Sequence, residues 1–106
     1  MTTLSAEFKK KVADLYLKNR EKLEKQDPAN FESFASEILE IINNEKKTSD
    51  ALHDLEILEH NMGLLKTYSS KLKQYTPETD EYDFTQNDCK NLVDSTKRWL
   101  NLEGLI

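Results

Sequence analysis

Apolar residues recur at steps of three and four in four separate stretches of the chain, and this spacing constrains the fold more than any other feature. Such steps place side chains on one side of an α-helix, because the helix completes a turn every 3.6 residues. The stripes are Phe8, Val12, Leu15, Tyr16, Leu23; Phe31, Phe34, Ala35, Ile38, Leu39, Ile42; Leu52, Leu55, Leu58, Met62, Leu65, Tyr68, Leu72; and Cys89, Leu92, Val93, Thr96, Trp99, Leu100. Because each stripe must be buried against another element, the pattern predicts an all-α protein, an antiparallel four-helix bundle.

The predicted bundle is a single domain over residues 1–106, with helices at about 5–25, 28–45, 49–75 and 86–102. Thr3 or Ser5 is placed to cap the first helix. Asp27 is a good cap for the second, and Pro28 follows it at the first helical position, where its fixed φ is already helical. The link between these two helices is therefore short, and we expect them to form an antiparallel hairpin.

The signals in the second half of the chain are weaker. Thr48 or Ser49 is placed to cap the third helix, and Thr76-Pro77 should end it, because proline disfavours helical geometry in the residue before it. Gly63 lies in the middle of this helix. It indicates a bend, a close contact with a neighbouring helix, or simply a tolerated glycine, and the sequence does not decide among them.

The last helix is expected to follow an acidic loop over residues 78–83. Thr85 is its predicted cap, with Asp88 three residues on as in a capping box and Phe84 placed to pack back onto the helix. Gly104 is available as a left-handed terminator.

Composition excludes several classes of function. The net charge of −5 argues against a nucleic-acid binder, which would need a basic excess to neutralise phosphates. Cys89 is the only cysteine, so no intramolecular disulfide can form, and its place on a stripe predicts a small buried apolar residue. The sequence shows neither a signal peptide nor a membrane-spanning run, so we expect a cytoplasmic protein with at most peripheral membrane contact.

Candidate chemical groups are sparse. His53, Glu56 and His60 share one helical face, but a metal site needs three or four converging ligands and no fourth is evident. The serines lack a motif that would activate them, and two glycines cannot make a phosphate-binding loop. We therefore expect neither an enzyme nor a protein that needs a cofactor or a metal.

The C-terminal end is the candidate interaction surface. It combines apolar side chains with two cations, a combination that suits a partner protein or a membrane surface. The candidate partner-binding residues are Lys97, Arg98, Trp99, Leu102, Leu105 and Ile106. Trp99 is the only tryptophan, and core packing is the other interpretation of its place on a stripe.

Several short segments resemble one known family. They are Val12-Ala13-Asp14-Leu15-Tyr16, Leu23-Glu24-Lys25-Gln26-Asp27, Phe31 with Phe34, Glu37-Ile38-Leu39-Glu40, and the Phe84-Thr85 step near the last helix. Together they are similar to the immunity proteins of pediocin-like (class IIa) bacteriocins, the enterocin A immunity family.

The resemblance implies a four-helix bundle in the cytosol of a Gram-positive bacterium that protects the cell from a bacteriocin. In that family the bacteriocin opens the membrane part of a mannose phosphotransferase permease, and the immunity protein is thought to engage this complex from inside. Specificity in the family is associated with the C-terminal half, which here corresponds to the chain after Thr76. Two other functions stay open: a helical adaptor that docks a peptide of a soluble partner, and a homo-oligomeric structural protein.

Overall fold

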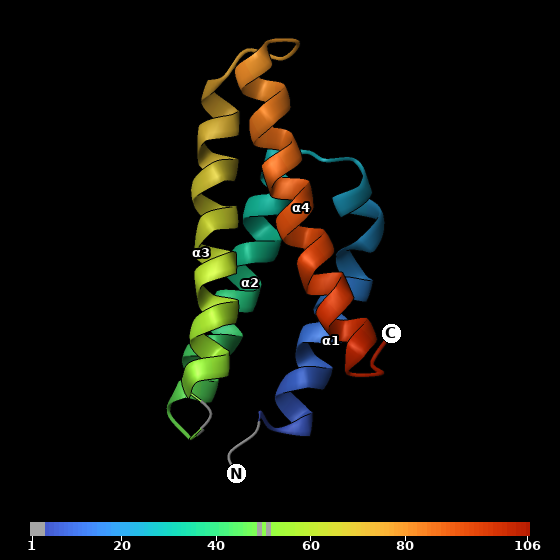
Figure 1. Cartoon of the computed structure of the whole chain (residues 1–106), viewed down its shortest axis with the longest axis vertical. Coiled ribbons are helices and arrows are strands. Elements are labelled where there is room, and N and C mark those ends of the chain that lie inside the picture. Colours follow the sequence, from blue (N-terminus) through green and yellow to red (C-terminus); the bar gives the residue numbers. More distant parts are fainter. Residues whose placement is uncertain (1–3, 49, 51) are drawn as a thin grey trace.

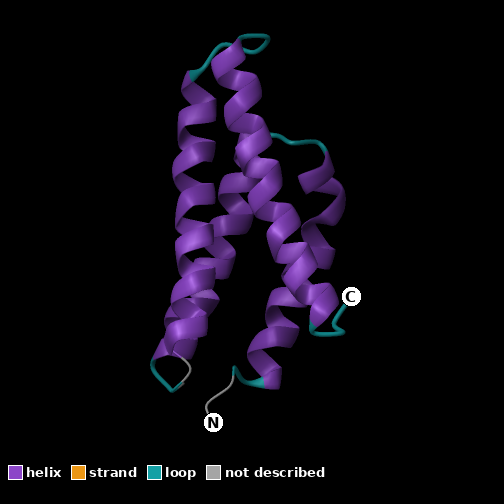
Figure 2. Cartoon of the chain, viewed as in Figure 1, coloured by secondary structure: helices purple, strands orange, loops and turns teal. Residues whose placement is uncertain are grey.

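The computed structural model describes residues 4–48, 50 and 52–106, and its described part contains helices and no strands. The helices are α1 (Ala6–Glu24), α2 (Pro28–Lys46), α3 (Leu52–Gln74) and α4 (Asp80–Leu102). Consecutive helices run in opposite directions and are joined by short connections (Figures 1 and 2). The prediction of an all-α four-helix bundle is confirmed.

The caps predicted for the first two helices are present. The Ser5 hydroxyl accepts a hydrogen bond from the Phe8 amide at 3.1 Å, and the Asp27 carboxylate accepts one from the Ala29 amide at 2.9 Å. Each bond satisfies an amide that has no partner within the helix. Thr3, the alternative cap for α1, lies outside the described residues. α1 ends in a tight turn in which Gln26 adopts a positive φ of 55°.

The predicted start of the last helix is wrong. α4 begins at Asp80, and its cap is Thr79, whose hydroxyl accepts a hydrogen bond from the Tyr82 amide at 3.3 Å. Thr85 therefore lies within the helix, and most of the predicted acidic loop is the first turn of α4. The physical reason is that carboxylates such as Asp80 and Asp83 are stabilised by the positive end of the helix dipole.

Two other predictions around α3 also need correction. The Thr48 hydroxyl donates to the Glu45 carbonyl at 3.4 Å and so closes the end of α2 instead of capping α3, while Ser49 lies outside the described residues. The stripe residue Leu52 is 48% exposed and not in the core, because it is the first residue of α3 and lies at the end of the bundle. Beyond its chain neighbours and the backbone of its own helix, a Cβ atom added to Gly63 would meet no described atom within 4 Å, which argues against a close contact with a neighbouring helix there.

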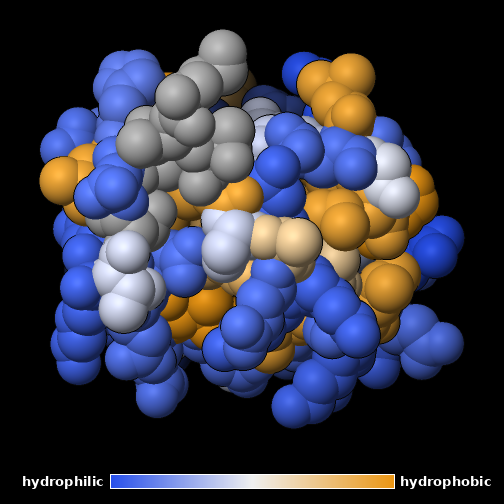
Figure 3. All heavy atoms as spheres, turned by 90° about the horizontal axis from the view of Figure 1, so that it is seen from below, coloured by the Kyte–Doolittle hydropathy of each residue, from blue (hydrophilic) through white to orange (hydrophobic). Residues whose placement is uncertain are grey.

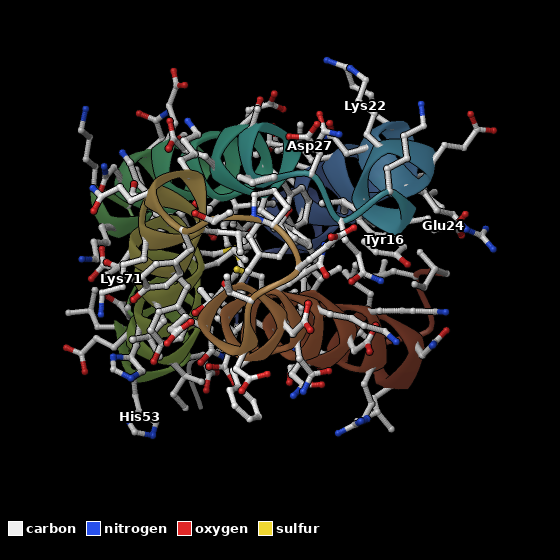
Figure 4. The ribbon with its side chains drawn as sticks, turned by 90° about the horizontal axis from the view of Figure 1, so that it is seen from above. Tyr16, Lys22, Glu24, Asp27, His53 and Lys71 are labelled. Carbon is white, nitrogen blue, oxygen red and sulfur yellow. The ribbon has the colours of Figure 1, made fainter. Side chains whose placement is uncertain are left out.

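The core lies on the central axis of the bundle, where the other stripe residues meet. In the view from above, the four helices surround it, with α2 beside α3 and α4 on the opposite side of the core from α2 (Figure 4). Phe34 and Ile38 of α2 and Met62 of α3 are fully buried, and the ring of Phe34 packs edge-on against Tyr16 of α1 at 6.5 Å. Cys89 is also fully buried, as predicted.

The axes of the antiparallel helices α3 and α4 diverge along the molecule. They meet closely at the hairpin that joins them, which extends beyond α1 and α2, and they diverge toward the end of the molecule that holds the N-terminus (Figure 1). The result is an elongated molecule of 47 × 23 × 17 Å.

Candidate functional site

A groove lies where α3 and α4 diverge, and the first residues of the described chain form part of its wall. Its volume is about 340 Å³. The lining comes from three helices and the segments that flank them: Leu4, Lys9, Asp54, Ile57, Leu58, Asn61, Ser95, Thr96, Trp99 and Glu103. Viewed from this end of the molecule, apolar surface is visible between hydrophilic side chains (Figure 3).

The α3 wall of the groove lies on a line of apolar residues along that helix. Ile57, Leu64 and Tyr68 follow one another along one face of α3, at steps of seven and four. Leu64 and Tyr68 are partly buried in the half of the molecule where the helices meet, whereas Ile57, in the open half, is 53% exposed. Trp99 of α4, which is partly buried, lines the groove together with Ile57.

The wall of the groove is apolar at its base and charged at its edge. Leu4, Leu58 and Thr96 are buried, and the Thr96 hydroxyl is satisfied because it donates to the Leu92 carbonyl at 3.2 Å. At the edge, the Lys9 ammonium donates to the Glu103 carboxylate at 2.8 Å and so links the start of α1 to the end of α4.

Asp54 is the third charged residue of the lining. In the part of the chain that the structure describes, its carboxylate forms no ion pair. The groove therefore combines an apolar base with one negative charge that the described residues do not neutralise.

The structure separates the six residues predicted as the partner-binding site. Trp99 both packs against the core and lines the groove. Lys97 and Arg98 are exposed and, as successive helical residues, point about 100° apart. Leu102 is 82% exposed and is not part of the groove wall.

The last residues fold back instead of forming a free tail. Gly104 has a φ of 73°, and the amides of Gly104 and Leu105 donate to the carbonyls of Asn101 and Leu100 at 3.1 and 3.0 Å. These two bonds define a Schellman motif, which confirms the predicted role of Gly104. Leu105 packs against the core, while Ile106 is 37% exposed.

Sequence reasoning missed most of the groove residues that α3 and the start of the chain contribute, although Leu58 belongs to the predicted stripe. Asp54, Ile57 and Asn61 lie beside the main stripe of α3, and Leu4 precedes the first predicted helix. One signal was available: Ile57 and Leu64 lie outside the main stripe and, with Tyr68 of that stripe, form a second apolar line on α3. A second line indicates that the helix has a second neighbour, but not where that neighbour leaves it uncovered.

The other candidate groups do not converge on a chemical site. His53, Glu56 and His60 lie outside the core, and His53 points away from the bundle (Figure 4). Among the described residues, no group of three or more His, Cys, Asp or Glu side chains is placed to hold a metal ion. Burial raises the pKa of the Cys89 thiol to about 11, so the reactive thiolate is scarce at neutral pH.

Comparison with family models, with curated proteins and with solved structures gave no match for this chain. No helix in the described ranges is both long and apolar enough to cross a membrane.

Proposed function

We propose that the protein is a cytosolic, non-enzymatic immunity protein that protects its cell from a pediocin-like bacteriocin. In this proposal it engages the bacteriocin-bound mannose permease at the inner face of the membrane. The family resemblance of the sequence supplies the identity of the partner, and the structure supplies a surface suited to binding.

The observation that carries the proposal is the apolar surface at the end of the molecule where α4 terminates. Ile57 and Leu102 are 53% and 82% exposed there, and a groove with a tryptophan in its wall lies between α3 and α4. Exposed apolar side chains cost free energy in water, so a concentration of them favours a protein or membrane partner. This surface includes the C-terminal segment that the resemblance associates with specificity.

The proposal is tested by survival. A pediocin-sensitive strain that expresses the protein is challenged with a panel of class IIa peptides. We expect protection against one or a few of them, because immunity in this family is selective. Equal killing by every peptide, with folded protein abundant in the cells, would contradict the proposal.

Leu102→Ser is the sharper variant for assigning the surface. Removing Leu105 and Ile106 would also break the Schellman motif, and Trp99→Ala would disturb the core, so loss of protection by either has two explanations. Leu102 is 82% exposed, so its replacement should leave stability within about 0.5 kcal/mol. Leu17→Ser on α1, at 47% exposure, is the matched control.

The groove also favours a second candidate, a helical adaptor that docks a peptide of a soluble partner. Helix pairs that separate to leave an apolar groove are a recurring way to bind amphipathic helices. An adaptor binds its peptide with no membrane component present and leaves bacteriocin sensitivity unchanged. An immunity protein changes survival and associates with membranes only when bacteriocin and permease are both there.

A further inference from the structure

We propose that the groove between α3 and α4 binds one face of a cationic amphipathic helix. An apolar side chain of that helix enters between Ile57 and Trp99, and a neighbouring lysine or arginine pairs with Asp54. This inference rests on the proposed binding function, because it names the chemistry of the partner at that same end of the molecule.

The geometry of the two helices favours a helical occupant. Ile57 on α3 and Trp99 on α4 both line the groove. The two helices diverge toward the end of the molecule that holds the N-terminus (Figure 1). A third helix laid there would continue the α3–α4 interface and would cover the exposed part of Ile57. The volume of about 340 Å³ exceeds that of a single side chain, so residues on successive turns of the occupant would be accommodated.

The charged residues of the lining favour an occupant with positive charge. Two of the three charged residues are acidic, and Lys9 is already paired with Glu103 at 2.8 Å. Asp54 forms no ion pair among the described residues and can attract a cation, and the protein as a whole carries a net charge of −5. An anionic lipid headgroup would be repelled at the same place, which favours a cationic peptide over a membrane surface.

Two-dimensional ¹H–¹⁵N NMR spectra, recorded with and without a model peptide, test the inference. The probe is a short synthetic helix of leucine and lysine with the leucines on one face, and the control peptide has the same composition with the leucines scattered around the helix. We expect the probe to shift the resonances of Asp54, Ile57 and Ser95 and the indole of Trp99, and to bind more tightly than the control peptide.

Two variants separate groove binding from general charge attraction. Ile57→Ser should weaken binding of the probe about ten-fold, because the entering side chain loses its apolar contact. Asp54→Asn should weaken it about two- to five-fold and reduce its dependence on salt. Leu17→Ser and Asp14→Asn change the same properties on α1, outside the groove, and should bind as the parent does. Ile57 is 53% exposed, so its variant should remain folded, which circular dichroism verifies.

Several results would overturn the inference. One is equal binding of the probe by all four variants, and another is a set of resonance shifts confined to the hairpin end of α3 and α4. A third is a shift of the groove resonances with phosphatidylglycerol vesicles but not with the peptide. A fourth is a dimer of this protein that closes the groove. The inference and the proposed function fail separately. If the parent protein gives no protection in cells, the proposed function fails but peptide binding in the groove is unaffected. If an Ile57→Ser protein that no longer binds the probe still protects fully, the groove takes no part in immunity.

Discussion

The same substitution at the two glycines should change stability in opposite directions. Gly63 lies inside α3, and Gly104 follows the end of α4 with a φ of 73°. Beyond the chain neighbours and the local helix backbone, a Cβ atom at either position would meet no described atom within 4 Å. Packing is therefore unaffected in both cases, and only the backbone preference of the residue decides the outcome.

The magnitudes follow from that preference. In a helix interior, alanine is more favourable than glycine by about 1 kcal/mol, so Gly63→Ala should stabilise the protein by about that amount. In the left-handed conformation an alanine Cβ crowds the following carbonyl, so Gly104→Ala should destabilise it by about 1 kcal/mol. For a domain of this size each change corresponds to a shift in Tm of about 5 °C.

Thermal and urea unfolding followed by circular dichroism at the helical band measure both effects. The double variant should unfold close to the parent, because the sites lie on different helices and share no contact. Destabilisation by Gly63→Ala would contradict this prediction, since it would mean that α3 bends or approaches a neighbour there. An unchanged stability of Gly104→Ala would show that the C-terminal turn is not held in the left-handed form.

Three further predictions concern the caps, a strained turn and the buried thiol. Thr79→Ala should lower the free energy of unfolding by about 1 kcal/mol, and Thr85→Ala by much less, which urea unfolding checks; the reverse order would restore Thr85 as the cap. Gln26→Gly should raise it by about 0.5 kcal/mol, because glycine adopts the φ of 55° without strain while the carbonyl still accepts from Gln86; a loss of stability would contradict this. The pKa of Cys89 is raised from 9.0 to about 11 in the folded protein, so the unfolded thiol ionises first and stability should fall as pH rises from about 9 toward 11. The free energy of unfolding of Cys89→Ala should not show this decrease between about pH 9 and pH 11, which urea unfolding at several pH values checks.

The elements that sequence predicted well are those fixed by local chemistry. Asp27 followed by Pro28 specifies a helix start by itself, and the structure places α2 there. The stripes identified nearly all of the core, because a residue at the centre of an apolar helical face is buried against the neighbouring helices. Thr85 misled because Thr79 and Thr85 are both competent caps, and the choice depends on where the α3–α4 turn allows the helix to begin.

The candidate site was less predictable because it arises from the relative directions of helices. Trp99 was found through its residue type and its place near the chain end. Ile57 and Asp54 were not, since nothing in the local sequence indicates that α4 diverges from α3 and leaves them uncovered. Leu105 is the opposite case, because it was predicted to contact a partner. The Schellman motif at Gly104 instead folds it back against the core.

Survival of a pediocin-sensitive strain that expresses this protein, during challenge with class IIa bacteriocins, is the decisive measurement for the proposed immunity function. We expect selective protection by the parent and by Leu17→Ser, and reduced protection by Leu102→Ser at equal levels of folded protein. Killing of all these strains to the extent of cells without the protein would contradict it.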